Sequence, residues 1–250
     1  MRPVPDPTFA ERRLARIYDL LDLDRSDLDA YVAMVEEFGA RSVLDIGCGT
    51  GTFACLLARR GVAVTAVDPA EASLEVARLK PGADRVRWVH GLVTGLPALQ
   101  VDLATMTANV AQVFLTDEEW DATLRAARRA LRPGGRLVFE TREPAARAWL
   151  SWNREATYRH AVLPGVGGVE TWCSLIAVTS DPAAGDRVSF RWSFVFDADG
   201  AVLTSDSTLR FRHREEVSAS LAVTGFTVDE IRDAADRPGR EMVFVARRAR

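Results

Sequence analysis

The stretch VLDIGCGTG, Val43 to Gly51, combines a hydrophobic run with three glycines at alternate positions. The run predicts a buried strand that contains a single acid, Asp45. The glycines predict a tight turn that leads from this strand into a helix over Thr52 to Arg60. Such a turn directs backbone N–H groups without helical partners toward one point at the carboxyl end of the strand, where an anionic group of a ligand is favoured.

The spacing of the glycines argues against a phosphate as that anionic group. A dinucleotide-binding turn reads G-x-G-x-x-G, whereas Gly47, Gly49 and Gly51 read G-x-G-x-G and are followed by Thr52. A P-loop requires a lysine and a serine or threonine after its last glycine, and neither register supplies that pair. The sequence therefore favours a ligand other than a diphosphate.

Two carboxylates indicate what the ligand is. Asp45 lies just before the turn, where its carboxylate can bind a cationic group of the ligand. A ligand with an anionic and a cationic group close together is an amino acid. Asp68 ends the next predicted strand, where a carboxylate can bind the two hydroxyls of a ribose. An amino acid and a ribose are both parts of S-adenosylmethionine, which we predict as the cofactor.

Strand and helix patterns alternate on both sides of the glycine turn. Two helices are expected between Ala10 and Ala40, with Ser26 as the N-cap of the second. The alternation that follows predicts a parallel, doubly wound sheet. The expected strands are Ser42 to Ile46, Val62 to Val67, Val86 to Val89, Val101 to Met106 and Arg136 to Phe139, the expected helices are Thr52 to Arg60, Ala70 to Leu79 and Asp117 to Leu131, and Pro133 to Gly135 is expected to turn from the last helix into the last strand.

After Thr141 the pattern changes to antiparallel strands. Val188 to Phe196 alternates apolar and polar residues, Asp197 to Gly200 supplies a turn, and Leu203 to Phe211 can return as a hairpin partner. Glu170 to Thr179 adds a further strand, so we expect an inserted β cap with an aromatic face. Beyond it the sequence predicts a helix over Glu215 to Ala222 and strands over Phe226 to Ile231 and Glu241 to Ala246.

Composition limits the classes of partner. The chain has 250 residues and a formal net charge of -3, with 32 basic and 35 acidic side chains. This charge argues against nucleic acid and against an anionic membrane. The cysteines Cys48, Cys55 and Cys173 form no paired framework and no zinc motif, so we predict no metal site. With no apolar leader in the sequence, a cytoplasmic protein is expected.

In these motifs the chain resembles the class I S-adenosylmethionine-dependent methyltransferases. VLDIGCGTG is similar to the first motif of this family, and VTAVDPAEASLEVAR is similar to its second strand and the helix after it. VDLATMTANVAQVF resembles the fourth strand and ALRPGGRLVFE resembles the fifth. The C-terminal GFTVDEIRD and EMVFVARR resemble the last two strands, which form an antiparallel hairpin in the family.

The resemblance implies which residues hold the cofactor. The backbone from Gly47 to Gly51, including Cys48 and Gly49, would hold the methionine end, with Asp45 orienting its ammonium. Asp68, followed by Pro69, would bind the ribose. The family commonly has Gly-Asp after the third strand, whereas this chain has Gly91-Leu92, so only a backbone N–H is left for the adenine. The full set of expected cofactor residues is Asp45, Gly47, Cys48, Gly49, Gly51, Asp68, Pro69, Gly91, Leu92 and Asn109.

Residues for catalysis and acceptor binding are harder to identify from the sequence. Tyr18 resembles a tyrosine that many small-molecule members fold over the cofactor. His160 is the histidine best placed to act as a base, because it begins the inserted region. Arg142 follows the fifth strand at the ligand-binding edge and could bind an anionic group of the acceptor. Trp172, in the predicted cap, is a candidate for acceptor contact.

The sequence therefore predicts a single methyltransferase domain over residues 1–250. Residues 1–40 would form a helical lid, 41–141 and 214–250 a seven-stranded Rossmann-like core, and 142–213 the inserted cap. The predicted function is methylation of a small metabolite, with an amine favoured and hydroxyl or carbon acceptors left open. Two alternatives remain, namely a protein that binds the cofactor without transfer and a nicotinamide-dependent oxidoreductase. The chain is expected to be a monomer or a homodimer.

Overall fold

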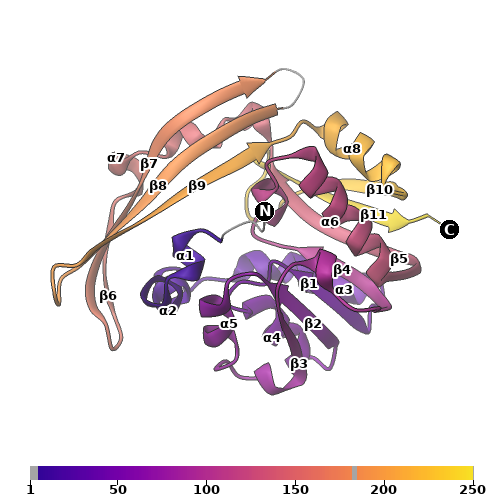
Figure 1. Cartoon of the computed structure of the whole chain (residues 1–250), viewed down its shortest axis with the longest axis horizontal. Helices are drawn as coiled ribbons and strands as arrows, with labels where there is room; N and C mark the ends of the chain where they lie inside the picture. Colours follow the sequence, from indigo (N-terminus) through magenta and orange to yellow (C-terminus); the bar gives the residue numbers. More distant parts are fainter. Residues whose placement is uncertain (1–4, 182–184, 250) are drawn as a thin grey trace.

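A seven-stranded sheet forms the core of the structure, a computed structural model that describes residues 5–181 and 185–249 (Figure 1). Its strands are β1 (Ser42–Ile46), β2 (Ala63–Asp68), β3 (Val86–His90), β4 (Val101–Met106), β5 (Leu131–Arg142), β10 (Phe226–Asp233) and β11 (Glu241–Arg248). Their order is β10-β11-β5-β4-β1-β2-β3. The strands β1 to β5 are parallel, and β10 and β11 form an antiparallel hairpin at one edge. The predicted α/β sheet with an antiparallel C-terminal hairpin is confirmed.

The helices are α1 (Pro7–Ala10), α2 (Arg12–Leu21), α3 (Asp29–Glu37), α4 (Thr52–Arg59), α5 (Glu71–Ala77), α6 (Asp117–Ala130), α7 (Arg154–Thr157) and α8 (Arg214–Val223). Side chains alternate along β1, so Leu44 and Ile46 pack with α6 and α8 on one face. Val43 packs with α3 and α4 on the other face. Both faces are therefore covered, as a parallel sheet requires.

A second sheet forms the cap beside the core (Figure 1). Its strands, in spatial order, are β6 (Arg159–Leu163), β7 (Gly167–Asp181), β8 (Gly185–Phe196) and β9 (Val202–Phe211), all antiparallel. One face carries Phe194 and Phe196, which pack on Leu14 and Ile17 of α2. The N-terminal helices therefore lie against the cap, and Figure 1 shows α1 and α2 between the cap and the core.

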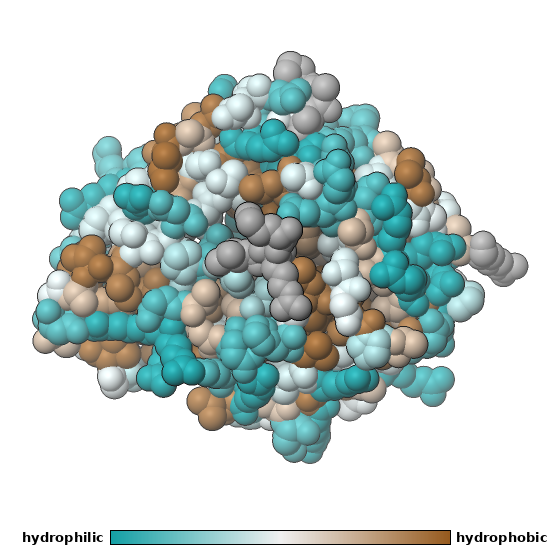
Figure 2. Space-filling model, in the orientation of Figure 1, coloured by the Kyte–Doolittle hydropathy of each residue, from teal (hydrophilic) through white to brown (hydrophobic). Residues whose placement is uncertain are grey.

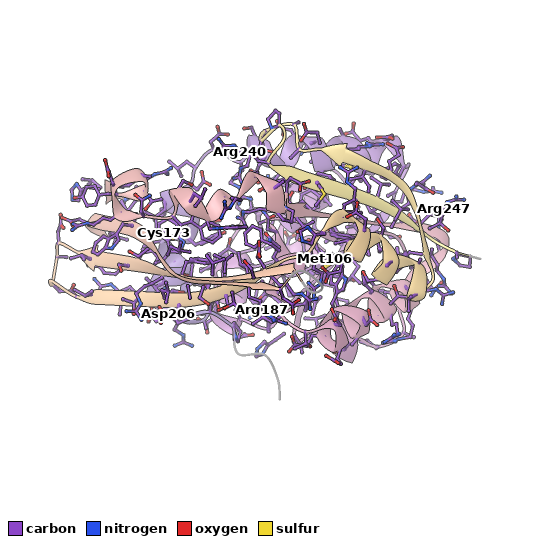
Figure 3. All side chains as sticks on the ribbon, turned by 90° about the horizontal axis from the view of Figure 1, so that it is seen from above. Met106, Cys173, Arg187, Asp206, Arg240 and Arg247 are labelled. Carbon is purple, nitrogen blue, oxygen red and sulfur yellow. The ribbon has the colours of Figure 1, made fainter. Side chains whose placement is uncertain are left out.

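Two buried arginines join the cap to the core. Arg210, near the end of β9, pairs with Asp117 at 2.8 Å and with Glu216, which belong to α6 and α8. Arg212 donates to the Phe114 carbonyl oxygen at 2.8 Å. Figure 3 shows Arg187, near the start of β8, at this junction, where it donates to the Leu115 carbonyl oxygen at 3.3 Å. Charged groups this deeply buried are stable only when paired, so we expect the junction to be rigid.

The structure corrects three details of the sequence prediction. Ser26 is not the N-cap of α3, because it opens a 3-10 turn (Ser26–Leu28) and α3 begins only at Asp29. Strand β6 was not predicted, since most of its residues are exposed and show no apolar alternation. Pro133 to Gly135 lies within β5 as an irregularity, because Leu131 already pairs with Val101 of β4.

Candidate functional site

The glycine turn between β1 and α4 has the tight backbone that its sequence predicts. Gly47, Gly49 and Gly51 have φ angles of 71°, 51° and 75°, in the left-handed region that favours glycine. A Cβ on Gly47 would meet Val110 at 2.7 Å, and one on Gly51 would meet Trp88 and Ala77. A Cβ on Gly49 would meet nothing within 4 Å. The turn is therefore tightly packed at both ends and open at its middle.

The expectation that the turn presents free N–H groups is wrong for four of its residues. The Gly51 N–H donates to the Cys48 carbonyl oxygen at 2.8 Å within the turn. The N–H groups of Gly47 and Cys48 both donate to the Val67 carbonyl oxygen, at 2.9 and 3.3 Å. The Gly49 N–H donates to Asp68 Oδ2 at 2.8 Å. The turn is thereby fastened to the end of β2, which brings Asp68 directly beside it.

Asp45 lies at the end of β1 beneath the turn and is 1% exposed. The hydrogen bond recorded for its carboxylate comes from Thr105 Oγ1 at 3.1 Å. Burial raises the pKa of Asp45 to about 7, and the Asp68 charge adds to this effect. A buried carboxylate with so little neutralisation is well suited to receive a cationic group.

Asp68 and the loop after β3 complete this edge of the sheet. Asp68 Oδ1 accepts from the Ala70 N–H at 2.7 Å, and burial is the main cause that raises its pKa. The Gly91 N–H donates to the Asp68 carbonyl oxygen at 3.0 Å, and His90 Nε2 lies 3.0 Å from the Pro69 carbonyl oxygen. Leu92 follows as the N-cap of a 3-10 turn. The predicted cofactor residues on β1, β2 and β3 thus lie around one edge.

Helix α2 is bonded to the glycine turn by residues that were not predicted from the sequence. Asp19 Oδ1 accepts from Thr50 Oγ1 at 2.8 Å and from Thr52 Oγ1 at 3.1 Å. Lys80 pairs with Asp19 Oδ2 at 2.6 Å. Lys80 is the single lysine of the chain, and this singled it out in the sequence. Its partners could not be predicted, because they lie far from it along the chain.

Tyr18, next to Asp19 on α2, lies on the same side of the molecule as Arg142. Its ring packs on Phe9 at 5.3 Å between centroids, and burial raises the pKa of its hydroxyl. Tyr18 is close enough to affect the pKa of the Arg142 guanidinium, which burial lowers. Arg142 donates to Gln112 Oε1 at 2.8 Å. Arg142 therefore lies at the edge where β5 ends, and Tyr18 on α2 is near enough to act on its charge.

Two glutamates that the sequence did not predict as site residues lie beside Arg142. Glu140 is on β5, and Glu241 on β11 pairs with Arg142 across the antiparallel register. The Asn109 N–H donates to Glu140 Oε1 and the Asn109 side-chain amide donates to Glu241 Oε1, each at 3.0 Å. Asn109 has a left-handed φ of 61° after β4. This places Asn109, predicted to bind the cofactor, between two buried acids.

His160 and Trp172 lie elsewhere. His160 on β6 is exposed and its Nε2 lies 2.9 Å from Asp197, in the turn between β8 and β9. Trp172 pairs with Ser193 across β7 and β8, on the face opposite Phe194, with the Arg154 guanidinium 4.6 Å above its ring. The structure does not bring either residue to Arg142 or to the glycine turn. Their proposed roles stay predictions.

These residues fit S-adenosylmethionine. Asp45 is a buried carboxylate that lacks a cationic partner among the residues that the structure describes, and it is placed to meet the methionine ammonium. Asp68 has its carboxylate at the end of β2, where a ribose would lie. The open space at Gly49 leaves room for the ligand backbone to approach the turn.

Comparison with known proteins also indicates a methyltransferase. Residues 43–135 match a methyltransferase domain family. The cypemycin N-terminal methyltransferase of a Streptomyces species is 33% identical over 144 residues, which are 56% of this chain and 59% of the relative. The ubiquinone biosynthesis O-methyltransferase of Alkalilimnicola ehrlichii is 29% identical over 158 residues, 63% of each chain. The chain thus spans about three fifths of the length of these relatives.

Solved structures match over nearly the whole chain. An S-adenosylmethionine-dependent methyltransferase from Clostridium acetobutylicum has a TM-score of 0.74 at 17% identity and covers 95% of this chain and 98% of its own. A sugar N-methyltransferase from a Streptoalloteichus species has a TM-score of 0.74 at 21% identity and covers 93% of both chains. These likenesses extend to the cap as well as the core.

Residues 43–135 thus form a methyltransferase domain, and the chain has the fold of the S-adenosylmethionine-dependent methyltransferases. The strand order, the glycine turn and the two aspartates at the ends of β1 and β2 are the structural basis of this assignment. Within residues 5–181 and 185–249, no helix is both long and apolar enough to cross a membrane.

The raised pKa of Asp45 predicts how stability changes with pH. Since its folded pKa is about 7 against an ordinary 3.8, the folded state holds the proton more tightly between these values. The resulting stabilisation is complete below about pH 4 and is lost as the pH rises through about 7. Asp45→Asn removes this dependence, so the variant should gain stability relative to the wild type between pH 5 and 8. Urea unfolding of both proteins across that range measures the difference, and parallel curves would contradict the prediction.

Proposed function

We propose that this protein transfers a methyl group from S-adenosylmethionine to an amine of a small metabolite. The observation that carries the proposal is the position of Arg142, Glu140 and Tyr18. Glu140 and Arg142 lie where β5 ends, at the same carboxyl edge of the sheet at which β1 and β2 present Asp45 and Asp68, with β4 between β5 and β1. Tyr18 on α2 acts on the charge of Arg142. The acceptor would bind there between the core, α2 and the cap.

The chain's own residues would align the two reactants and exclude water. S-adenosylmethionine, when bound, supplies an electrophilic methyl group on a sulfonium. Asp45 would orient the ammonium of the cofactor and Asp68 would bind its ribose, while the backbone of the glycine turn would contact the methionine part. Helix α2 would cover the site, because Asp19 ties it to Thr50 and Thr52 of the turn. Alignment of this kind is worth about 7–11 kcal/mol in well-oriented reactions.

An amine acceptor is supported by the kind of relatives that share this architecture. Among the structures that match this fold are a sugar N-methyltransferase and an amino pentose methyltransferase. The cypemycin enzyme is named for methylation of an N-terminus. Other relatives are O-methyltransferases, so hydroxyl acceptors are the alternative that a direct test should include.

The proposal is tested by titration followed by an acceptor panel. We expect S-adenosylmethionine and S-adenosylhomocysteine to bind with measurable heat and to raise the melting temperature. The panel contains glucosamine, a short peptide with a free N-terminus and a catechol, and mass spectrometry detects a gain of one methyl group. Methylation of an amine supports the proposal, and methylation of the catechol alone would move it to an O-methyltransferase. Binding without turnover on any acceptor would favour a protein that binds the cofactor without transfer, and binding of a pyridine dinucleotide instead would favour an oxidoreductase.

A further inference from the structure

A buried pair of carboxylates lies where β5 ends and β11 begins, joined by Asn109 from the loop after β4. Glu140 is 7% exposed and Glu241 is 5% exposed. Both accept hydrogen bonds from Asn109, one from its backbone and one from its side chain, at 3.0 Å. Asn109 is followed by Val110, whose side chain fills the space beside Gly47. Glu140 is therefore held close to the part of the turn that would contact the methionine end of the cofactor.

The side-chain oxygen of Asn109 is the second feature of this cluster. Its side chain is 4% exposed, and its Oδ1 atom is buried without a hydrogen-bond partner in the part of the chain that the structure describes. A buried amide oxygen without a donor costs free energy. The atom belongs to the same side chain that holds Glu241, so the carboxylate pair and the open acceptor lie in one cluster. A ligand with an N–H group beside Glu140 would satisfy it.

The charges around Glu140 come from three elements. Glu241 of β11 raises the pKa of Glu140, while Arg142 on β5 and Arg237 in the turn before β11 lower it. Arg237 is occupied by Glu241 at 2.9 Å, and Arg142 by Gln112 at 2.8 Å. Burial of the carboxyl group is the largest cause, and the net effect raises the pKa of Glu140 to about 7. A carboxyl group of this kind exchanges its proton near neutral pH, which suits a general base.

We propose that Glu140 is the base that removes a proton from the ammonium of the acceptor, with Asn109 Oδ1 receiving a second N–H of the same group. This inference rests on the proposed function, since it requires an amine acceptor. One N–H bond of the ammonium breaks, its electron pair stays on nitrogen, and the proton passes to a Glu140 oxygen. The neutral amine then has the lone pair that methylation needs. Glu140 releases the proton to water after the product leaves.

The test compares Glu140→Gln with Glu143→Gln. Both changes replace a carboxylate by an amide, and the glutamine at position 140 can still accept from the Asn109 N–H. Glu143 accepts from the Ala145 N–H, outside the cluster. With a peptide acceptor, whose α-amino pKa is about 8, only about a tenth of the acceptor is neutral at pH 7, so Glu140→Gln should lose about 10-fold in kcat/KM there. At about pH 9.5 the acceptor is already neutral, so the variant should approach the wild-type rate. Glu143→Gln should follow the wild type throughout.

A second variant examines the carboxylate pair. Because the Glu241 charge raises the pKa of Glu140, Glu241→Gln should move the acidic limb of the kcat profile to lower pH, a shift that mere loss of packing would not give. Calorimetry with S-adenosylhomocysteine should give Glu140→Gln the wild-type affinity. An equal loss at every pH with retained cofactor affinity would overturn the role of Glu140 and leave methyl transfer standing. If the wild type methylates no amine, both proposals fail.

Discussion

Replacing Gly51 with alanine is expected to lower the free energy of unfolding by about 3 kcal/mol, the sum of a left-handed backbone strain and an overpacked site. Gly51 has a φ of 75°, and a Cβ there would meet Trp88 and, at 2.7 Å, Ala77. The Trp88 ring cannot easily move, since its indole N–H donates to the Ala83 carbonyl oxygen at 3.0 Å. Urea denaturation measures the loss, and the melting temperature should fall by about 6–12 °C.

Gly61→Ala is the matched control for this prediction. Gly61 also has a left-handed φ, of 84°, but a Cβ there would meet nothing within 4 Å. The control therefore carries the backbone strain alone, about 1 kcal/mol. Equal losses in the two variants would show that the contact with Trp88 and Ala77 contributes nothing to stability.

Asp45→Asn is expected to weaken binding of S-adenosylhomocysteine by about 10- to 100-fold, the usual worth of a hydrogen bond between charged groups. The carboxylate is buried beneath the glycine turn and accepts a hydrogen bond from Thr105 Oγ1. A ligand ammonium should stabilise its ionised form, so binding near pH 7 should release a proton from Asp45. Calorimetry in buffers of different ionisation enthalpy detects that proton, which the variant should not release.

Two controls separate this contact from general damage. Asp84→Asn makes the same change at an exposed position and should bind like the wild type. The second control is 5′-methylthioadenosine, which lacks the amino acid part of the cofactor and should bind the wild type and Asp45→Asn equally. If the variant lost affinity for both ligands to the same extent, Asp45 would not be the partner of the ammonium.

Much of the core could be predicted from the sequence, because its signals are local. The hydrophobic run of β1, the glycines after it and the alternation along β8 each depend on neighbouring residues, and the structure has these elements where they were expected. Strand β6 escaped prediction because its exposed residues carry no such signal. Ser26 was misplaced because the Asp24 carboxylate accepts its N–H at 3.0 Å, which starts a tighter turn ahead of α3.

The charged part of the candidate site could not be predicted, because tertiary pairing assembles it. Glu241 meets Arg142 through the antiparallel register of β11 on β5, and no spacing in the sequence encodes that register. Asp19 reaches the glycine turn only after α2 packs against it. The direction of the cap was equally hidden, since a shift of one position along β8 would have placed Ser193 rather than Phe194 toward α2.

The two arginines at the end of β9 bear on how small molecules enter and leave. Arg210 and Arg212 are 2% and 3% exposed and hold the cap on α6 and α8, so the cap has little freedom to swing away. On the core side, helix α2 is attached through Asp19, which binds Thr50 and Thr52, while the ion pair of Arg12 with Glu75 is exposed and contributes little. We expect traffic of acceptor and product to pass where α1 and α2 lift from the core, with the cap serving as a fixed wall.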